Sequence, residues 1–126
     1  MAERKHAQGA APVFMYLFTW ETPVLNGRLK SCHALEIPFV FDNIARATRF
    51  TGDAPERFAL AEKMSEAWLA FARTGVPAYR ELPVWQAYDT ETRATMIFDQ
   101  ACRVENDPDG ELRRAWSDIP IANRRA

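Results

Sequence analysis

The sequence predicts an α/β fold in one domain that covers residues 1–126. Residues 12–20 form an almost continuous apolar and aromatic run, which is typical of a strand buried on both faces of a helix-covered parallel sheet. Residues 53–75 carry apolar side chains at three- and four-residue steps, as an amphipathic helix does. The short apolar stretch 94–98 follows a turn and indicates a second strand.

The first third of the chain alternates regular structure with turns. Residues 2–8 have the composition of the end of a helix, with Gly9 as its stop signal. The run 12–20 also fits a buried helix, but its aromatic residues favour a strand. Pro23 and the pair Asn26-Gly27 predict a loop that ends at His33. Pro38 argues against a central strand over 34–43 and favours the start of a helical turn.

The segment 53–75 is the clearest element. Asp53 is a suitable N-cap residue and Glu56 follows three positions later, which approximates a capping box, while Pro55 fits the first turn. Gly75 suits a left-handed C-cap. The apolar stripe is expected to face the core: Leu60, Ala61, Met64, Ala67, Trp68 and Phe71. Beyond it, we expect a turn at 89–91, a strand over 94–98, a turn at 106–110 and a short closing helix over 111–119.

Charge and composition exclude several classes of function. Sixteen basic residues balance 17 acidic ones, so nothing favours a nucleic acid or an anionic membrane as partner. No apolar run reaches the roughly 18 residues of a membrane span, and the polar first ten residues do not resemble a secretory signal. We therefore expect a cytoplasmic protein. Cys32 and Cys102 are expected to be reduced thiols, with a disulfide as the weaker alternative, and no metal-ligand spacing or other cofactor motif is present.

Three blocks of the sequence resemble one family. They are HALEIPFVF at 33–41, MSEAWLAFARTGVP at 64–77 and LPVWQAYDTETRATMIFD at 82–99. In this order they resemble the C-terminal segment of the type-B carboxylesterases, the α/β-hydrolase family that includes bacterial para-nitrobenzyl esterases and the cholinesterases. The resemblance runs from about residue 12 to about residue 119, and FDN at 41–43 resembles the bacterial branch. It implies the C-terminal portion of an α/β-hydrolase fold: one or two late strands, a histidine loop, a long amphipathic helix and a closing helix.

The resemblance implies that His33 is the general base of a catalytic triad. A neutral imidazole accepts the proton of a serine hydroxyl that attacks an ester carbonyl, and then returns it to the leaving alcohol. From composition alone, a single histidine in a loop is usually an ordinary surface residue. In the intact enzyme the resemblance implies hydrolysis of small-molecule carboxylic esters through an acyl-enzyme.

The rest of the catalytic machinery is not found in the sequence. Ser31, Ser65 and Ser117 are the three serines; none stands in a G-x-S-x-G motif, and no Gly-Gly oxyanion loop occurs. The chain is expected to be the last quarter of such an enzyme, either read from an internal methionine or encoded by a truncated gene. We expect the isolated chain not to hydrolyse esters.

Other candidate residues have simpler interpretations. The resemblance implies that Glu36 fixes the loop, because the family's triad acid lies upstream, and that Cys32 is a packing residue rather than a nucleophile. Core packing is favoured over a pocket for four aromatic residues: Phe39, Phe41, Trp68 and Phe71. The alternative function is a small non-catalytic α+β module that acts by binding or oligomerisation. An unpartnered apolar strand predicts that the isolated chain aggregates or self-associates, unless a missing N-terminal segment covers it.

Overall fold

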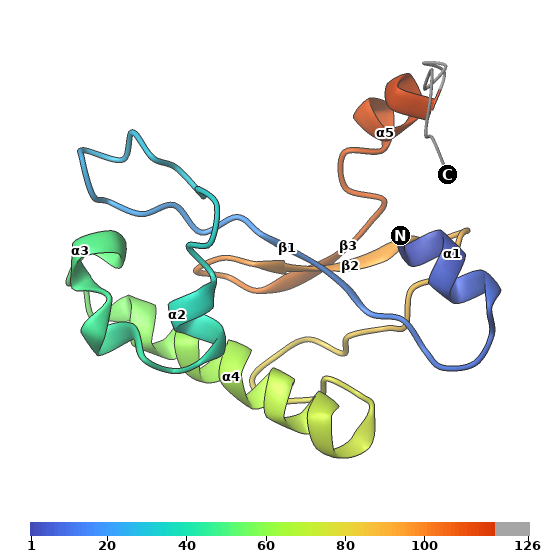
Figure 1. The fold of residues 1–126 in the computed structure, drawn as a ribbon, viewed down its shortest axis with the longest axis horizontal. Coiled ribbons are helices and arrows are strands. Elements are labelled where there is room, and N and C mark those ends of the chain that lie inside the picture. Colours follow the sequence, from blue (N-terminus) through green and yellow to red (C-terminus); the bar gives the residue numbers. More distant parts are fainter. Residues whose placement is uncertain (118–126) are drawn as a thin grey trace, which may run out of the picture.

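A three-stranded sheet with helices packed around it is the centre of the computed structural model, which describes residues 1–117 (Figure 1). The elements are α1 (Ala2–Ala7), β1 (Met15–Phe18), α2 (Ile37–Val40), the 3-10 turn η1 (Ile44–Arg46), α3 (Thr48–Thr51), α4 (Glu56–Thr74), β2 (Ala94–Phe98), β3 (Arg103–Asn106) and α5 (Gly110–Ser117). Both strands that the sequence predicts are present, and so is the long helix. The predicted α/β class is therefore confirmed.

The sheet has the strand order β1-β2-β3 and mixes two pairings. β1 pairs with β2 in parallel, with Met15 opposite Thr95 and Phe18 opposite Phe98. β2 pairs with β3 antiparallel. All five residues of the central strand β2 are buried, as expected for a strand that has a neighbour on each side.

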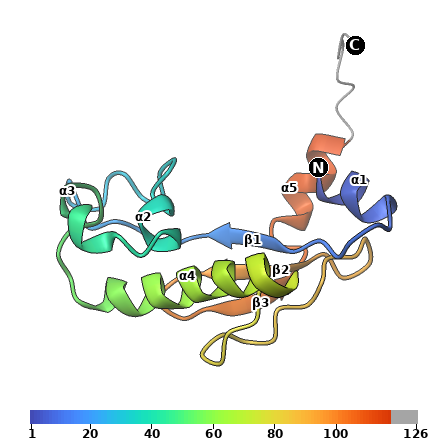
Figure 2. The same ribbon diagram turned by 60° about the horizontal axis from the view of Figure 1, so that its bottom comes forward.

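Helix α4 lies along one face of the sheet (Figure 2). Four residues of the predicted stripe are buried: Leu60, Ala61, Met64 and Ala67. Trp68 is half-buried, and its ring meets Tyr16 of β1 at a centroid distance of 5.0 Å and Phe98 of β2 at 6.0 Å. Phe71 departs from the prediction, because 46% of it is exposed near the end of the helix.

The short helices divide between the two ends of the sheet. α2 and α3 lie at one end, and α1 and α5 lie at the other (Figures 1 and 2). The predicted helical turn at Pro38 is confirmed, since Pro38 lies in the first turn of α2, where its missing N–H has no partner to lose. Phe39 is fully buried from this helix and packs on Phe18 and Trp20.

The predicted start of α4 is wrong. The helix begins at Glu56, the N-cap position is occupied by Pro55 with helical dihedral angles (φ −69°, ψ −28°), and no side chain caps it. Asp53 therefore lies too far upstream to act as N-cap, and Glu56 is not in the third position of a capping box. The predicted C-terminus is confirmed, since Gly75 adopts φ +79° and donates its N–H to the carbonyl of Phe71.

Two further predictions about strands are corrected. β1 is shorter than 12–20, and it is not buried on both faces: Tyr16 is 37% exposed and Leu17 38% exposed. The physical reason is that, within the described residues, β1 is an edge strand paired only with β2, so its side chains lack the second row of neighbours that helps to bury those of β2. The sequence does not predict β3, because Arg-Val-Glu-Asn is too polar to show the apolar pattern of a strand. The predicted closing helix is confirmed as α5, and its positions 118 and 119 lie outside the described residues.

The reduced state predicted for the cysteines is confirmed, because Cys32 and Cys102 are both free thiols. Burial raises the pKa of the Cys102 thiol, which opposes its ionisation. Over residues 1–117, no helix combines the length and the apolar character that crossing a bilayer requires.

Candidate functional site

His33 lies in the long loop that leaves the carboxyl end of β1. In parallel sheets, such loops are the usual location of functional residues, because the carboxyl ends of neighbouring strands meet at one edge. The loop is closed upon itself by a hydrogen bond from the N–H of Thr22 to the carbonyl of Lys30 at 3.3 Å. The buried hydroxyl of Thr22 also donates to the carbonyl of Phe50 at 2.7 Å, which ties the loop to α3.

Two contacts hold the backbone on either side of His33. On the N-terminal side, the hydroxyl of Ser31 donates to the carbonyl of Phe18, the last residue of β1, at 2.7 Å. On the C-terminal side, Leu35 is fully buried, and its N–H donates to the carbonyl of Cys32 at 3.2 Å. This second bond closes a turn in which Ala34 has φ +65°. The histidine therefore projects from a short segment that is held at both ends.

The side chain of His33 is exposed, and within residues 1–117 its imidazole makes no hydrogen bond. The three serine hydroxyls are all occupied elsewhere. Ser31 bonds to Phe18, Ser65 bonds to the carbonyl of Glu62 at 3.2 Å, and Ser117 bonds to the carbonyl of Arg113 at 2.9 Å. The described part of the chain thus presents an imidazole that can carry a proton, and no serine that is paired with it.

Glu36 and Cys32 flank His33 without forming a triad. Glu36 is half-buried at the N-cap of α2. The pKa of the Tyr16 hydroxyl on β1 is raised, mainly by burial and further by the negative charge of Glu36. Cys32 is half-buried and packs against the core, so the prediction that it is a packing residue is confirmed.

The four candidate aromatic residues lie in three different environments: the core, the surface and the lining of a cavity. Phe39 is a core residue, as predicted, whereas Phe41 is 71% exposed and the prediction of core packing is wrong for it. Trp68 and Phe71 help to line an apolar cavity of about 150 Å³ between β1 and α4, together with Phe14 and Trp85. His33 does not line this cavity. The rings of Phe14 and Trp85 meet edge to face at 6.0 Å.

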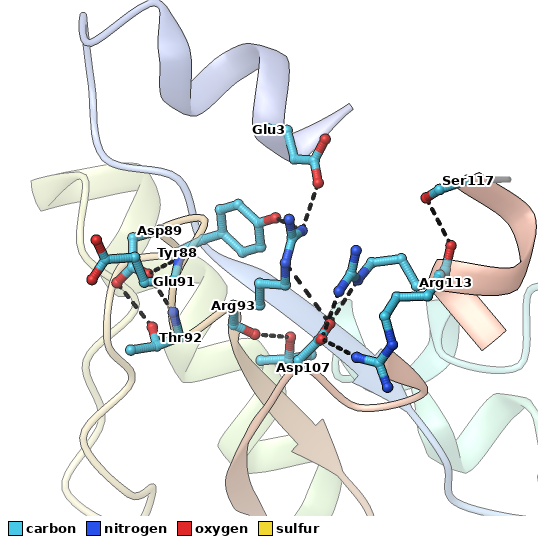
Figure 3. Close-up of polar contacts among 11 residues, drawn as sticks. Glu3, Tyr88, Asp89, Glu91, Thr92, Arg93, Asp107, Arg113 and Ser117 are labelled. Atoms are coloured by element: carbon cyan, nitrogen blue, oxygen red, sulfur yellow. Dashed lines mark hydrogen bonds and ion pairs between the residues drawn. The ribbon is translucent and has the colours of Figure 1, made fainter. Parts of the chain in front are cut away.

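Sequence reasoning missed a polar cluster at the other end of the sheet (Figure 3). Arg93 precedes β2 and pairs with Glu3 of α1 at 2.6 Å, and its guanidinium also donates to the hydroxyl of Tyr88 at 2.6 Å. Asp107 follows β3 and accepts two hydrogen bonds from Arg113 of α5, at 2.9 and 2.8 Å. These four charged groups border a cavity of about 320 Å³. In the part of the chain that the structure describes, no three His, Cys, Asp or Glu residues are grouped so that they could hold a metal ion.

Comparison with known proteins identifies a family for nearly the whole described chain. Residues 1–116 match the carboxylesterase family. The para-nitrobenzyl esterase of Bacillus subtilis (strain 168) is 42% identical over 116 residues, which cover 82% of this chain and 21% of that enzyme. The phenmedipham hydrolase of Pseudarthrobacter oxydans is 34% identical over 101 residues, which cover 76% of this chain and 20% of that enzyme. The chain therefore spans about a fifth of the length of these relatives.

Solved structures agree with the sequence matches. The carboxylesterase EST55 of Geobacillus stearothermophilus superposes with a TM-score of 0.76 at 49% identity, over 91% of this chain and 24% of that one. An esterase from Clostridium hathewayi that can hydrolyse aliphatic aromatic polyesters superposes with a TM-score of 0.78 at 31% identity, over 90% of this chain and 22% of that one. With a matching family over 116 of its residues and the fold of part of an α/β-hydrolase esterase, this chain belongs to the carboxylesterase family.

Proposed function

We propose that this chain is the C-terminal segment of a serine carboxylesterase and that His33 is the general base of that enzyme. The observation that carries the proposal is the position of His33: its imidazole is exposed and projects from a segment held at both ends, beyond the carboxyl end of β1. The block HALEIPFVF supports the same role through its resemblance to the family's histidine block. The substrates proposed for the intact enzyme are small carboxylic esters.

The proposed reaction uses His33 twice. In the first step, the imidazole accepts the proton of a serine hydroxyl as the oxygen attacks the ester carbonyl. The imidazolium then donates the proton to the departing alkoxide, which leaves as the alcohol and an acyl-enzyme remains. In the second step, His33 takes a proton from water, the hydroxide attacks the acyl carbonyl, and the proton returns to the serine oxygen. Exposure of the imidazole favours these transfers, because a fully buried ring could not meet a hydroxyl from another segment.

The nucleophile, the acid and the oxyanion hole must come from a polypeptide outside this sequence, since no G-x-S-x-G motif occurs in the 126 residues. We therefore propose that the isolated chain is inactive. The proposed mechanism uses no metal or other cofactor. The proposal includes a cytoplasmic location and no nucleic-acid or membrane partner.

Complementation tests this function. The full chain is co-expressed with the upstream part of the Bacillus subtilis para-nitrobenzyl esterase, the relative that is 42% identical over 116 residues. We expect hydrolysis of a para-nitrophenyl ester by the co-purified complex, and a loss of at least about 10³-fold in kcat with His33→Ala. His6→Ala is the matched control, because His6 lies at the exposed surface of α1. Activity that survives His33→Ala, or turnover by the chain alone, would refute the proposal.

The open edge of β1 leads to a second expectation, for the chain expressed without an upstream esterase segment. Tyr16 and Leu17 expose apolar surface beside unpaired backbone groups, an arrangement that favours pairing with another strand. We propose that the isolated chain self-associates through this strand. Light scattering after size exclusion should show oligomers, and Leu17→Lys should shift them towards the monomer. A monomeric wild-type chain would contradict the self-association.

A further inference from the structure

We propose that Ser31 is a positioning residue for His33, an inference that rests on the proposed function. Ser31 precedes the histidine by two positions, and its hydroxyl donates to the carbonyl of Phe18 at 2.7 Å. The two residues are 13 positions apart, so the bond links the loop back to the end of the strand from which it came.

The bond matters because, within residues 1–117, it is the hydrogen bond that ties this side of the histidine segment directly to β1. The backbone bond from Thr22 to Lys30 at 3.3 Å closes the loop upon itself, and Cys32 packs against the core, but neither contact reaches the strand end at Phe18. The loop between Phe18 and Ser31 contains an exposed ion pair, Lys30 to Glu21 at 2.7 Å, with both side chains more than half exposed. Such a pair stabilises a loop only weakly. The bond of Ser31 is partly buried, and a partly buried hydrogen bond between a hydroxyl and a backbone carbonyl is the stronger constraint.

Removal of the Ser31 hydroxyl should leave the chain folded, whereas removal of the buried contact on the other side of His33 would not. Leu35 is fully buried in the core with Phe39, so its truncation would destabilise the whole chain. Removal of the Ser31 hydroxyl opens no cavity of comparable size. Because the imidazole itself makes no hydrogen bond within residues 1–117, the described contacts position it only through the backbone of residues 31–35. A shift of about 1 Å in a catalytic group is sufficient to lower a rate by roughly 100-fold.

The first test uses the full chain and needs no activity. We expect Ser31→Ala to increase amide hydrogen exchange in the peptide that contains residues 31–36, where the N–H of Leu35 bonds to Cys32. The expected increase is roughly fivefold, the ratio that corresponds to the loss of one ordinary hydrogen bond. Ser31→Thr retains the hydroxyl and should restore slow exchange. Ser65→Ala is the matched control, because Ser65 also donates to a backbone carbonyl but lies in α4.

The second test measures turnover in the co-purified complex. We expect Ser31→Ala to lower kcat by roughly tenfold with KM changed less than about twofold, because the substrate still binds while the base is displaced. Ser31→Thr should recover most of kcat, and Ser65→Ala should leave both parameters unchanged. A structural defect alone would reduce the amount of active complex but would leave kcat per active site unchanged.

The outcomes separate the two proposals. Unchanged exchange in Ser31→Ala, or faster exchange with kcat unaltered, overturns the role of Ser31 and leaves the role of His33 standing. A wild-type complex that is inactive, or whose activity does not need His33, overturns the proposed function and the catalytic role of Ser31 together.

Discussion

Ala34, the residue after His33, has a backbone conformation that its side chain disfavours. Its φ of +65° lies in the left-handed region, where a Cβ atom crowds the following carbonyl at a cost of about 1–2 kcal/mol. The conformation is retained because the turn around it places Leu35 in the core and is closed by two backbone bonds, Leu35 to Cys32 and Ile37 to Ala34. The direction of the histidine segment is thus set by burial of its neighbour.

A glycine at this position should therefore stabilise the chain. Ala34→Gly removes the crowding, and the extra freedom of glycine in the unfolded chain offsets part of the gain, which leaves about 0.5 kcal/mol of added stability. The control is Ala70→Gly within α4, where the same change should cost about 1 kcal/mol. Urea denaturation of both variants measures the difference. Equal destabilisation by the two substitutions would show that Ala34 is not strained.

At the scale of elements, Arg57 joins the start of α4 to the two short helical turns before it. Only 3% of this residue is exposed. Its guanidinium donates to three uncharged oxygens: the carbonyl of Ala54 at 3.0 Å, the carbonyl of Ile44 in η1 at 3.0 Å and the hydroxyl of Thr51 in α3 at 2.9 Å. These contacts tie the first turn of α4 to η1 and α3, but they do not cap its free N–H groups, because a guanidinium only donates hydrogen bonds.

Removal of the Arg57 guanidinium should lower the stability of the chain. Arg57→Met keeps the apolar stem but removes the donor to the buried Thr51 hydroxyl, to the carbonyl of Ala54 and to that of Ile44, which keeps a bond from the N–H of Ala47. We therefore expect a loss of about 2 kcal/mol in the free energy of unfolding. The comparison is Arg73→Met in the last turn of α4, an exposed position where the change should stay within about 0.5 kcal/mol. Thermal or urea denaturation distinguishes the two. If both variants lost the same small amount, the three hydrogen bonds would not stabilise the start of the helix.

At the scale of the whole molecule, the polar cluster joins segments from both ends of the chain (Figure 3). Arg93 and Glu3, which pair at 2.6 Å, are 90 positions apart. Asp107 lies within 3.9 Å of Arg93 and Arg114 and bonds to Arg113, so three cations surround this carboxylate. No residue of α5 is buried, and the bonds of Asp107 therefore supply a large part of what holds this helix.

The cluster predicts lower stability in acid. The hydrogen bond from Arg113 lowers the pKa of Asp107, and the hydrogen bond from Arg93 lowers the pKa of Glu3. A carboxyl group whose pKa is lowered by folding contributes its full stabilisation above its ordinary pKa of roughly 4, and that contribution is lost as the pH falls through the lowered value. The melting temperature should thus fall below about pH 4.

Asp107→Asn tests the origin of this effect. The variant should melt at a lower temperature at neutral pH and should show a weaker dependence on pH between about 5 and 2. Asp109→Asn is the control, because the side chain of Asp109 makes no ion pair among residues 1–117. Melting followed by circular dichroism at a series of pH values gives both curves. Parallel curves for the wild type and Asp107→Asn would exclude the cluster as the cause.

The sequence by itself determined the features that depend on neighbouring residues. The period of apolar residues predicted α4, the Gly75 stop predicted its end, and the apolar run with its turn predicted β2 over its full length. The three blocks indicated the family, and they singled out His33. Its exposed position in a loop after β1 agrees with that interpretation, while its catalytic role stays a prediction.

Only the tertiary structure decided the features that join distant positions. The start of α4 depends on Arg57 and its contacts with η1 and α3, and the polar strand β3 forms because the buried strand β2 offers it a partner. The bond from Ser31 to Phe18 and the pair of Arg93 with Glu3 span 13 and 90 positions. Such contacts arise from the path of the folded chain. Neither the local spacing of apolar residues nor the turn-forming residues predict them. The exposure of β1 has the same origin, since burial of a strand is a property of its neighbours in the sheet.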